Sequence, residues 1–118
     1  MRQQIGDRLI DYSVKIIFLV EEIPQKRGTR KLIDQLLSSS WSVGANYEEA
    51  QAAESKADFI HKLQVSLKEM RESYYWLRVA KQAQYLKSPD SDVVLKESFE
   101  LRAILSKAVA TAKGKAKR

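Results

Sequence analysis

Apolar residues recur at steps of three and four along nearly the whole chain, in four stretches separated by short breaks. Side chains with that spacing share one face of an α-helix, so each stretch predicts an amphipathic helix. No segment of useful length shows the strict alternation of a β-strand, and no internal repeat is visible. Only two prolines and four glycines occur among the 118 residues, so the helices can run long. The fold class we expect is all-α.

Breaks in this pattern separate the four predicted helices, which span about residues 2–22, 29–53, 56–86 and 89–112. Pro24 ends the first helix because proline cannot continue it. Residue types that cap helix N-termini precede the other three helices: Thr29, Ser55 and Ser88. Short connections between four amphipathic helices predict an up-down-up-down antiparallel four-helix bundle. We assign residues 1–112 to this bundle and expect residues 113–118 to form a basic disordered tail.

The first predicted helix carries apolar side chains on two sides. Its main stripe consists of Ile5, Leu9, Tyr12, Ile16, Leu19 and Ile23. A second stripe consists of Ile10, Val14 and Ile17. A helix that is apolar on two sides is either buried on both or lies at an interface with another molecule. The sequence leaves both alternatives open.

The absence of cysteine narrows the chemistry and the compartment. It excludes disulfides, thiol catalysis and thiolate metal sites, and it favours a reducing environment. The most apolar run, from Ile16 to Val20, is too short for a membrane span of about 20 residues. No signal peptide is visible at the N-terminus. We therefore expect a cytoplasmic protein that does not associate with membranes.

Residues typical of catalysis or metal binding are nearly missing. Four-helix proteins that hold two iron ions need two Glu-x-x-His motifs. This chain has a single histidine, His61, and its Asp58-x-x-His61 motif has no second copy. No glycine-rich phosphate loop occurs, and no nucleophile is paired with a base. We expect no metal, no cofactor and no enzymatic activity.

Basic residues give the chain a formal net charge of +6 and form two clusters. One cluster, at the start of the second predicted helix, consists of Lys26, Arg27, Arg30 and Lys31. The other, at the C-terminus, consists of Lys113, Lys115, Lys117 and Arg118. Such cations are candidates for phosphate contacts, although ordinary solvated charge is an equally simple interpretation. No aromatic residue interleaves with either cluster, so base stacking is not indicated.

Two tryptophans suggest a subunit interface. On a helical wheel Trp41 falls opposite the apolar centre of its helix, and Trp76 falls in line with Val65 and Val79 on an outer face. Exposed aromatic patches mark interfaces, so we expect a homo-oligomer that uses these residues. The alternative is that the bundle itself covers both sides of the third helix.

A polar stripe follows the flank of the second predicted helix. Its members are Gln35, Ser42, Asn46, Glu49 and Ala53, at steps of three, four and seven. They predict either a buried polar network that fixes the register of the bundle or a contact point for a partner. Gly44 lies within this helix, where glycine costs about 1 kcal/mol relative to alanine, so we expect a close backbone approach there.

A resemblance to a known family lies in residues 35–50, which read QLLSSSWSVGANYEEA. This stretch is similar to the signature of bacterial four-helix-bundle proteins first recognised as open reading frames in intervening sequences of 23S rRNA genes. The similarity covers roughly Leu32 to Leu77, with Ser42, Asn46, Glu49 and Glu72 at the family's polar positions. Two residues depart from the pattern: Ser38 stands where arginine is usual, and Arg71 where acidic residues are common.

The resemblance implies a helical bundle that assembles as a homopentamer. One relative, the accessory protein of diversity-generating retroelements, is a basic pentamer that binds a reverse transcriptase and nucleic acid. The implied partners are therefore further copies of this chain, RNA or DNA, and a protein such as a reverse transcriptase. We expect a non-enzymatic oligomeric scaffold that binds nucleic acid through basic surface. The alternative is a protein-interaction adaptor that does not bind nucleic acid and uses the faces around Trp41 and Trp76.

Overall fold

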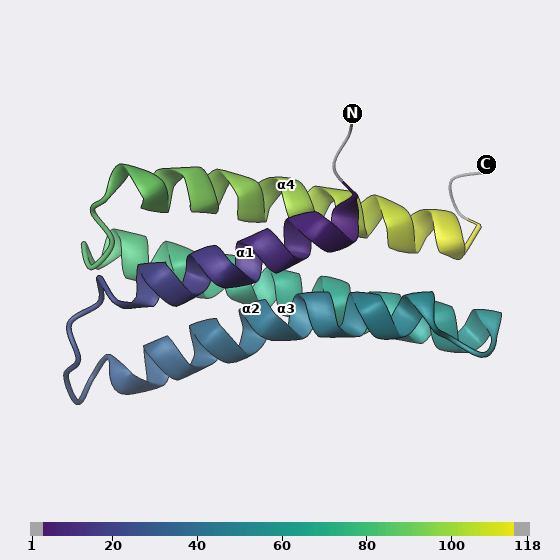
Figure 1. Ribbon diagram of the computed structural model, residues 1–118, viewed down its shortest axis with the longest axis horizontal. Coiled ribbons are helices and arrows are strands. Elements are labelled where there is room, and N and C mark those ends of the chain that lie inside the picture. Colours follow the sequence, from purple (N-terminus) through teal and green to yellow (C-terminus); the bar gives the residue numbers. More distant parts are fainter. Residues whose placement is uncertain (1–3, 115–118) are drawn as a thin grey trace.

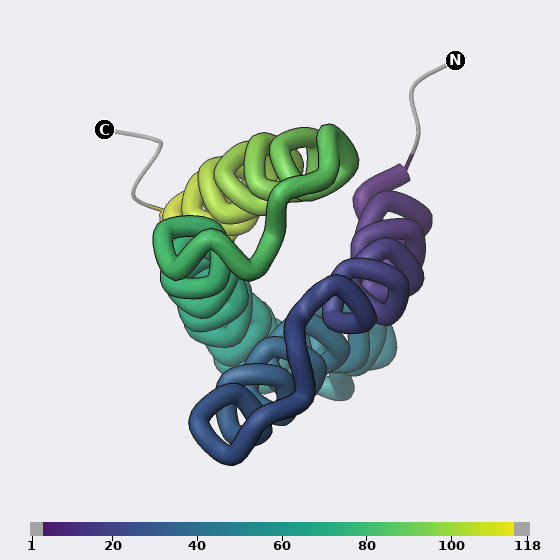
Figure 2. The backbone as a smooth tube through the Cα atoms, turned by 90° about the vertical axis from the view of Figure 1, so that its left-hand side faces the viewer, coloured from purple at the N-terminus to yellow at the C-terminus, as the bar shows by residue number. Residues whose placement is uncertain are grey.

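The computed structural model of the protein describes residues 4–114, which form four α-helices and no strand (Figure 1). The helices are α1 (Ile5–Val20), α2 (Arg30–Gln51), α3 (Lys56–Gln82) and α4 (Pro89–Ala112). Successive helices run in opposite directions, and the end-on view shows them following one another around a four-sided bundle (Figure 2). The predicted all-α, up-down-up-down four-helix bundle is confirmed. None of the four helices combines the length and the hydropathy that crossing a bilayer requires.

The core forms where the inward stripes of the four helices meet. Burial of these side chains supplies most of the free energy that favours folding, at about 25 cal/mol per Å² of apolar surface. The residues that are at most 2 % exposed include Leu9, Tyr12, Ile16, Leu19, Leu36, Val43, Leu63, Met70, Leu77, Val94, Leu101 and Leu105. Each of them occupies a position at which the helical period predicts burial, so the period defines the inward faces.

Buried hydroxyl groups join three of the helices inside this core. The Tyr12 hydroxyl lies 2.6 Å from Ser73 Oγ, which in turn lies 2.7 Å from Ser40 Oγ. Ser66 Oγ donates a hydrogen bond of 2.8 Å to the Val43 carbonyl. A buried hydroxyl is costly unless it is hydrogen-bonded, so these bonds favour one register of α1, α2 and α3. The hydrogen bonds that fix the register of the helices therefore lie on their core faces.

The helix ends match two of the three predicted caps. Ser55 Oγ accepts from the Asp58 N–H at 3.0 Å, and Ser88 Oγ accepts from the Ser91 N–H at 3.3 Å. Thr29 precedes α2 as predicted, but its hydroxyl does not cap the helix. It accepts from the Lys26 N–H and donates to the Pro24 carbonyl, so it organises the connection between α1 and α2.

The C-terminus of α3 differs from the sequence prediction, because α3 ends at Gln82 and not near Leu86. Gln84 adopts the left-handed conformation with a φ of 66°. The Tyr85 N–H then bonds to the Ala80 carbonyl and the Gln84 N–H to the Lys81 carbonyl, which is the pattern of a Schellman motif. The apolar spacing continues beyond the helix because Leu86 is buried at the end of the core, in the connection to α4.

Two further contacts hold α1 in the bundle. Arg8 pairs with Glu97 of α4 at 2.6 Å and with Glu100 at 3.3 Å. A Cβ atom added to Gly44 of α2 would lie 3.5 Å from Leu9 Cβ. This is an ordinary van der Waals distance to a side-chain atom of α1, so alanine would fit at this position and the close backbone approach expected at Gly44 is not found within residues 4–114.

Candidate nucleic-acid interface

The strongest candidate surface lies at the end of the bundle where α1 connects to α2. Lys26 and Arg27 belong to the connection, and Arg30 and Lys31 begin α2. All four side chains are exposed, and none of the ion pairs among residues 4–114 includes any of them. We call this group the basic end.

The basic end contains a shallow hollow of about 220 Å³. Lys26 and Arg30 line it together with Gln25, Ile33 and Asp34. The first turn of α2 carries no acidic residue, so the cations add to the partial positive charge of the helix N-terminus. Asp34 offsets part of this charge, yet the local balance remains positive and suits a phosphate group.

The second predicted basic cluster lies at the far end of the molecule. Lys113, which is exposed, follows α4, and the bundle is 45 Å long. Figure 1 shows the start of α2 and the end of α4 at opposite ends. The other members of that cluster, Lys115, Lys117 and Arg118, lie outside the described residues, as does most of the predicted tail. Within one chain, Lys113 and the basic end therefore do not belong to a common surface.

The two tryptophans differ in their surroundings. Trp41 is 46 % exposed, as predicted for an outer face. Trp76 is half-buried and packs against the core, so its predicted place on an open outer face is wrong. Val65 and Val79 are also half-buried, because α2 and α4 cover both flanks of α3. The exposed aromatic residue on α3 is the neighbouring Tyr75.

The Trp76 indole raises a separate point. Its N–H is buried and has no hydrogen-bond partner among residues 4–114. A buried donor without a partner is costly, so what favours tryptophan at this position is the size of its ring and not its N–H group.

The polar stripe of α2 forms local and surface contacts. Asn46 Nδ2 donates to the Ser42 carbonyl of its own helix at 2.9 Å. Glu49 pairs with Lys62 of α3 at 2.7 Å near the surface, and this bond raises the pKa of Lys62. Glu72 is half-buried on α3. The buried polar network predicted along this stripe is therefore wrong, and a partner contact there stays a prediction.

The second apolar stripe of α1 is open to solvent in the single chain. Ile10, Val14, Ile17 and Phe18 are between 42 and 64 % exposed. We call these four residues the α1 outer stripe. Phe18 also lines, with Val93 and Val94, a hollow of about 290 Å³ between α1 and α4. Of the two alternatives left open by the sequence, burial within the chain is excluded.

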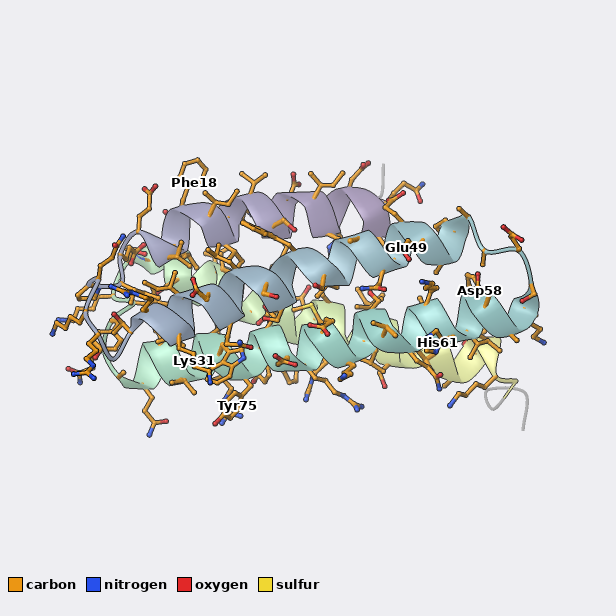
Figure 3. All side chains as sticks on the ribbon, turned by 90° about the horizontal axis from the view of Figure 1, so that it is seen from below. Phe18, Lys31, Glu49, Asp58, His61 and Tyr75 are labelled. Carbon is orange, nitrogen blue, oxygen red and sulfur yellow. The ribbon has the colours of Figure 1, made fainter. Side chains whose placement is uncertain are left out.

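A second set of cations was missed by the sequence analysis. Exposed side chains at steps of three and four follow the outside of α3: Lys68, Arg71, Tyr75, Arg78 and Gln82. We call them the α3 outer row. The row contains no carboxylate. The spacing of these residues in the sequence could have revealed the row. In Figure 3, Tyr75 and Phe18 extend from opposite edges of the bundle, so the α3 outer row and the α1 outer stripe face different directions.

Two residues of α4 complete this surface. The Arg102 guanidinium lies 5.1 Å from the ring centres of both Tyr74 and Phe99. The Arg78 guanidinium lies 5.5 Å from the centre of the same Tyr74 ring. The rings of Tyr74 and Phe99 are 5.9 Å apart and tilted. Cation–π attraction holds two arginines of different helices around one aromatic pair.

No group of three His, Cys, Asp or Glu side chains within residues 4–114 is arranged to hold a metal ion. His61 is exposed on α3, and Figure 3 shows Asp58 on the same helix nearby.

The fold and these surfaces define an all-α, four-helix protein with unpaired cations at one end and along one side. The sequence profile of the 23S rRNA-intervening sequence protein family matches residues 2–107, so the chain belongs to this family. A solved structure from Bacteroides thetaiotaomicron, described as a protein of unknown function from the S23 ribosomal protein family, has a TM-score of 0.80 to this chain. It is 30 % identical and covers 90 % of this chain and 98 % of its own. No protein of curated function matches the sequence.

Proposed function

We propose that the protein is a non-enzymatic homo-oligomeric scaffold that binds RNA or DNA through its basic surface. One observation supports this most directly: the four cations of the basic end are exposed and lack carboxylate partners within residues 4–114. Cations without carboxylate partners are free to contact phosphates, and each such contact adds to the salt dependence of binding.

The α1 outer stripe supports the oligomeric part of the proposal. Four exposed apolar side chains at helical spacing favour burial against another protein surface. Trp41 adds a fifth exposed apolar side chain, on α2. A homopentamer, which the family resemblance implied, would carry a formal charge of +30 from five chains of +6. That charge would attract polyanions strongly at low ionic strength.

The test is the salt dependence of binding to a labelled 20-nucleotide RNA, measured by fluorescence anisotropy. A variant replaces the four cations of the basic end, Lys26, Arg27, Arg30 and Lys31, with glutamine. A matched control replaces four exposed lysines elsewhere, Lys15, Lys56, Lys96 and Lys107, and so has the same net charge. We expect the first variant alone to lose at least about tenfold in affinity, with a salt slope lower by about 3.

Equal losses in the two variants would mean that net charge, and not the basic end, determines binding. No binding by the unaltered protein at 50 mM salt would overturn the nucleic-acid role. Light scattering on the same samples tests assembly, since five chains of 13.5 kDa are easily separated from one.

A second candidate function is an adaptor that binds a protein partner, such as a reverse transcriptase, and no nucleic acid. The α1 outer stripe favours it too, because an exposed apolar stripe fits the groove or helix face of another protein. A single chain in light scattering, together with unchanged anisotropy of the RNA, would favour the adaptor.

A further inference from the structure

We propose that the outer side of α3 and α4 binds single-stranded nucleic acid by stacking bases on its aromatic rings and guanidinium groups. The surface consists of Arg71, Tyr75 and Arg78 of α3 and of Phe99 and Arg102 of α4, and we call it the arginine–aromatic ridge. The inference rests on the proposed nucleic-acid binding and assigns the form of nucleic acid and the side chains that contact bases.

The arginines of the ridge are held in place by rings and not by carboxylates. Arg102 and Arg78 both lie within 6 Å of the centre of the Tyr74 ring, at 5.1 and 5.5 Å. Neither belongs to any ion pair among residues 4–114. Two guanidinium groups near one ring repel each other, so an anion between or beside them is favoured. Charge complementarity therefore favours an anionic partner, such as one that carries phosphates.

Arg71 extends this positive surface along α3. It precedes Arg78 by seven residues, which is two helical turns, and therefore lies on the same face. Tyr75 lies between them in the α3 outer row, so cation, ring and cation alternate. The chain thus interleaves aromatic and basic side chains on this side, although neither of the two basic clusters recognised in the sequence does so.

Two rings of the ridge are available for stacking. Phe99 is 50 % exposed and Tyr75 is 55 % exposed. Beside Tyr75, a shallow hollow of about 420 Å³ is lined by Arg78, Val79, Gln82 and Ala83. A planar base can lie in such a hollow against the ring or the guanidinium while its phosphate meets an arginine. Stacking of this kind is a main source of affinity for single strands.

The geometry favours single strands over duplexes. In a double helix the faces of the bases are stacked on one another, so exposed protein rings cannot reach them. A duplex can use the arginines only through its phosphates, and an acidic peptide only through its carboxylates. A ligand with free base faces uses both the charges and the rings of the ridge.

The experiment compares a labelled 20-nucleotide single strand with the duplex of the same sequence by fluorescence anisotropy at 100 mM salt. The unaltered protein should bind the single strand at least about tenfold more tightly. The double variant Arg78→Lys, Arg102→Lys keeps the charge and removes the planar guanidinium groups. We expect it to lose about tenfold for the single strand and less than about twofold for the duplex, with an unchanged salt slope.

A second variant, Tyr75→Ala with Phe99→Ala, removes the exposed rings and leaves every charge. It should lose single-strand affinity by about tenfold or more. Val93→Ala is the control, because it removes an exposed apolar side chain of α4 that belongs neither to the ridge nor to the α1 outer stripe. Circular dichroism melting checks that each variant remains folded.

The outcomes separate this inference from the proposed function. Strong binding that is equal for single strand and duplex, and unchanged in both ridge variants, would overturn the ridge while the basic end remains a nucleic-acid site. Competition by polyglutamate as effective as that by unlabelled single strand would also overturn it, because polyglutamate has no bases. If the unaltered protein binds neither form, the proposed function itself fails, and the ridge proposal fails with it.

Discussion

Helices α1 and α3 lie diagonally across the bundle, and they differ mainly on the sides that face away from it (Figure 2). Inside, they are joined directly by the hydrogen bond between the Tyr12 and Ser73 hydroxyl groups. Outside, α1 presents the apolar α1 outer stripe, whereas α3 presents the cationic α3 outer row. The same core thus supports one outer surface suited to burial against protein and another suited to anions.

This difference shows which residues the fold leaves unconstrained. The inward positions of both helices must be apolar or hydrogen-bonded, because the core excludes water. The outward positions carry no such requirement, and polar, uncharged residues would serve there equally well. Exposed isoleucine and phenylalanine on α1 and unpaired arginine on α3 contribute little to the stability of one chain. Their chemistry therefore points to what the molecule binds.

The largest expected effect comes from comparing two adjacent isoleucines of α1. Ile16 is fully buried and Ile17 is 42 % exposed. Ile16→Ala should lower the free energy of unfolding by about 3 kcal/mol through lost burial and a cavity. Ile17→Ala should change it by less than about 0.5 kcal/mol in a single chain. Urea denaturation at low protein concentration measures both values.

The same pair tests whether the α1 outer stripe is covered in solution. If another copy buries Ile17, the cost of Ile17→Ala grows with protein concentration and light scattering shows a smaller mass. The loss of stability caused by Ile16→Ala, relative to the unaltered protein, should be the same at every protein concentration. An Ile17→Ala variant with unchanged mass and unchanged stability at every concentration would contradict an interface at this stripe.

A smaller effect is expected where α1 and α3 meet in the core. Tyr12→Phe removes the hydroxyl that bonds to Ser73, while Ser73 keeps its bond to Ser40. We expect a loss of about 1 to 2 kcal/mol in the free energy of unfolding, measured with urea at pH 7. Phe18→Ala, on the outer side of α1, is a control that should change the stability of a single chain by less than about 0.5 kcal/mol, so it is measured at low protein concentration.

The Tyr12 hydroxyl also gives this comparison a pH dependence. Burial raises the pKa of Tyr12, so the folded protein favours the neutral phenol. Unfolded tyrosine titrates near pH 10, and its contribution to stability is complete below that pH. The contribution is lost as the pH rises from about 10 through the raised pKa of the folded state. The stability advantage over Tyr12→Phe should therefore shrink above pH 10, and an advantage that grows there would contradict this account.

Much of the fold could be predicted from the sequence because helical period and burial are tightly coupled in a small bundle. Leu9, Ile16 and Leu19 occupy the expected core positions. The sequence left two alternatives for the surroundings of Trp76 and favoured the wrong one, since a helical wheel shows one helix and not the two neighbours that cover its flanks. The hydrogen bonds that fix the register were also predicted in the wrong place, on the flank of α2. Serine is interpreted as a small packing residue until the facing Tyr12 hydroxyl is known.

The candidate surfaces divide in the same way. The basic end is a run of nearby residues, so the sequence alone indicated it. The arginine–aromatic ridge joins Arg78 and Arg102 through Tyr74, across two helices and a connection. Such a pairing depends on the register of α3 against α4, which local patterns do not encode.

The smallest expected effect concerns the end of α3, just beyond its outer row. Gln84 holds a positive φ of 66°, which costs a residue with a side chain about 1 kcal/mol relative to glycine. Gln84→Gly should therefore raise the free energy of unfolding by up to about 1 kcal/mol, measured by thermal or urea denaturation. Part of this gain is offset because glycine also makes the unfolded chain more flexible.

Because Gln84 is exposed and outside the ridge, single-strand binding should stay unchanged. Lower stability would mean that the glutamine side chain contributes more than its backbone conformation costs. Weaker binding would mean that the ridge extends past Arg78 to the end of α3.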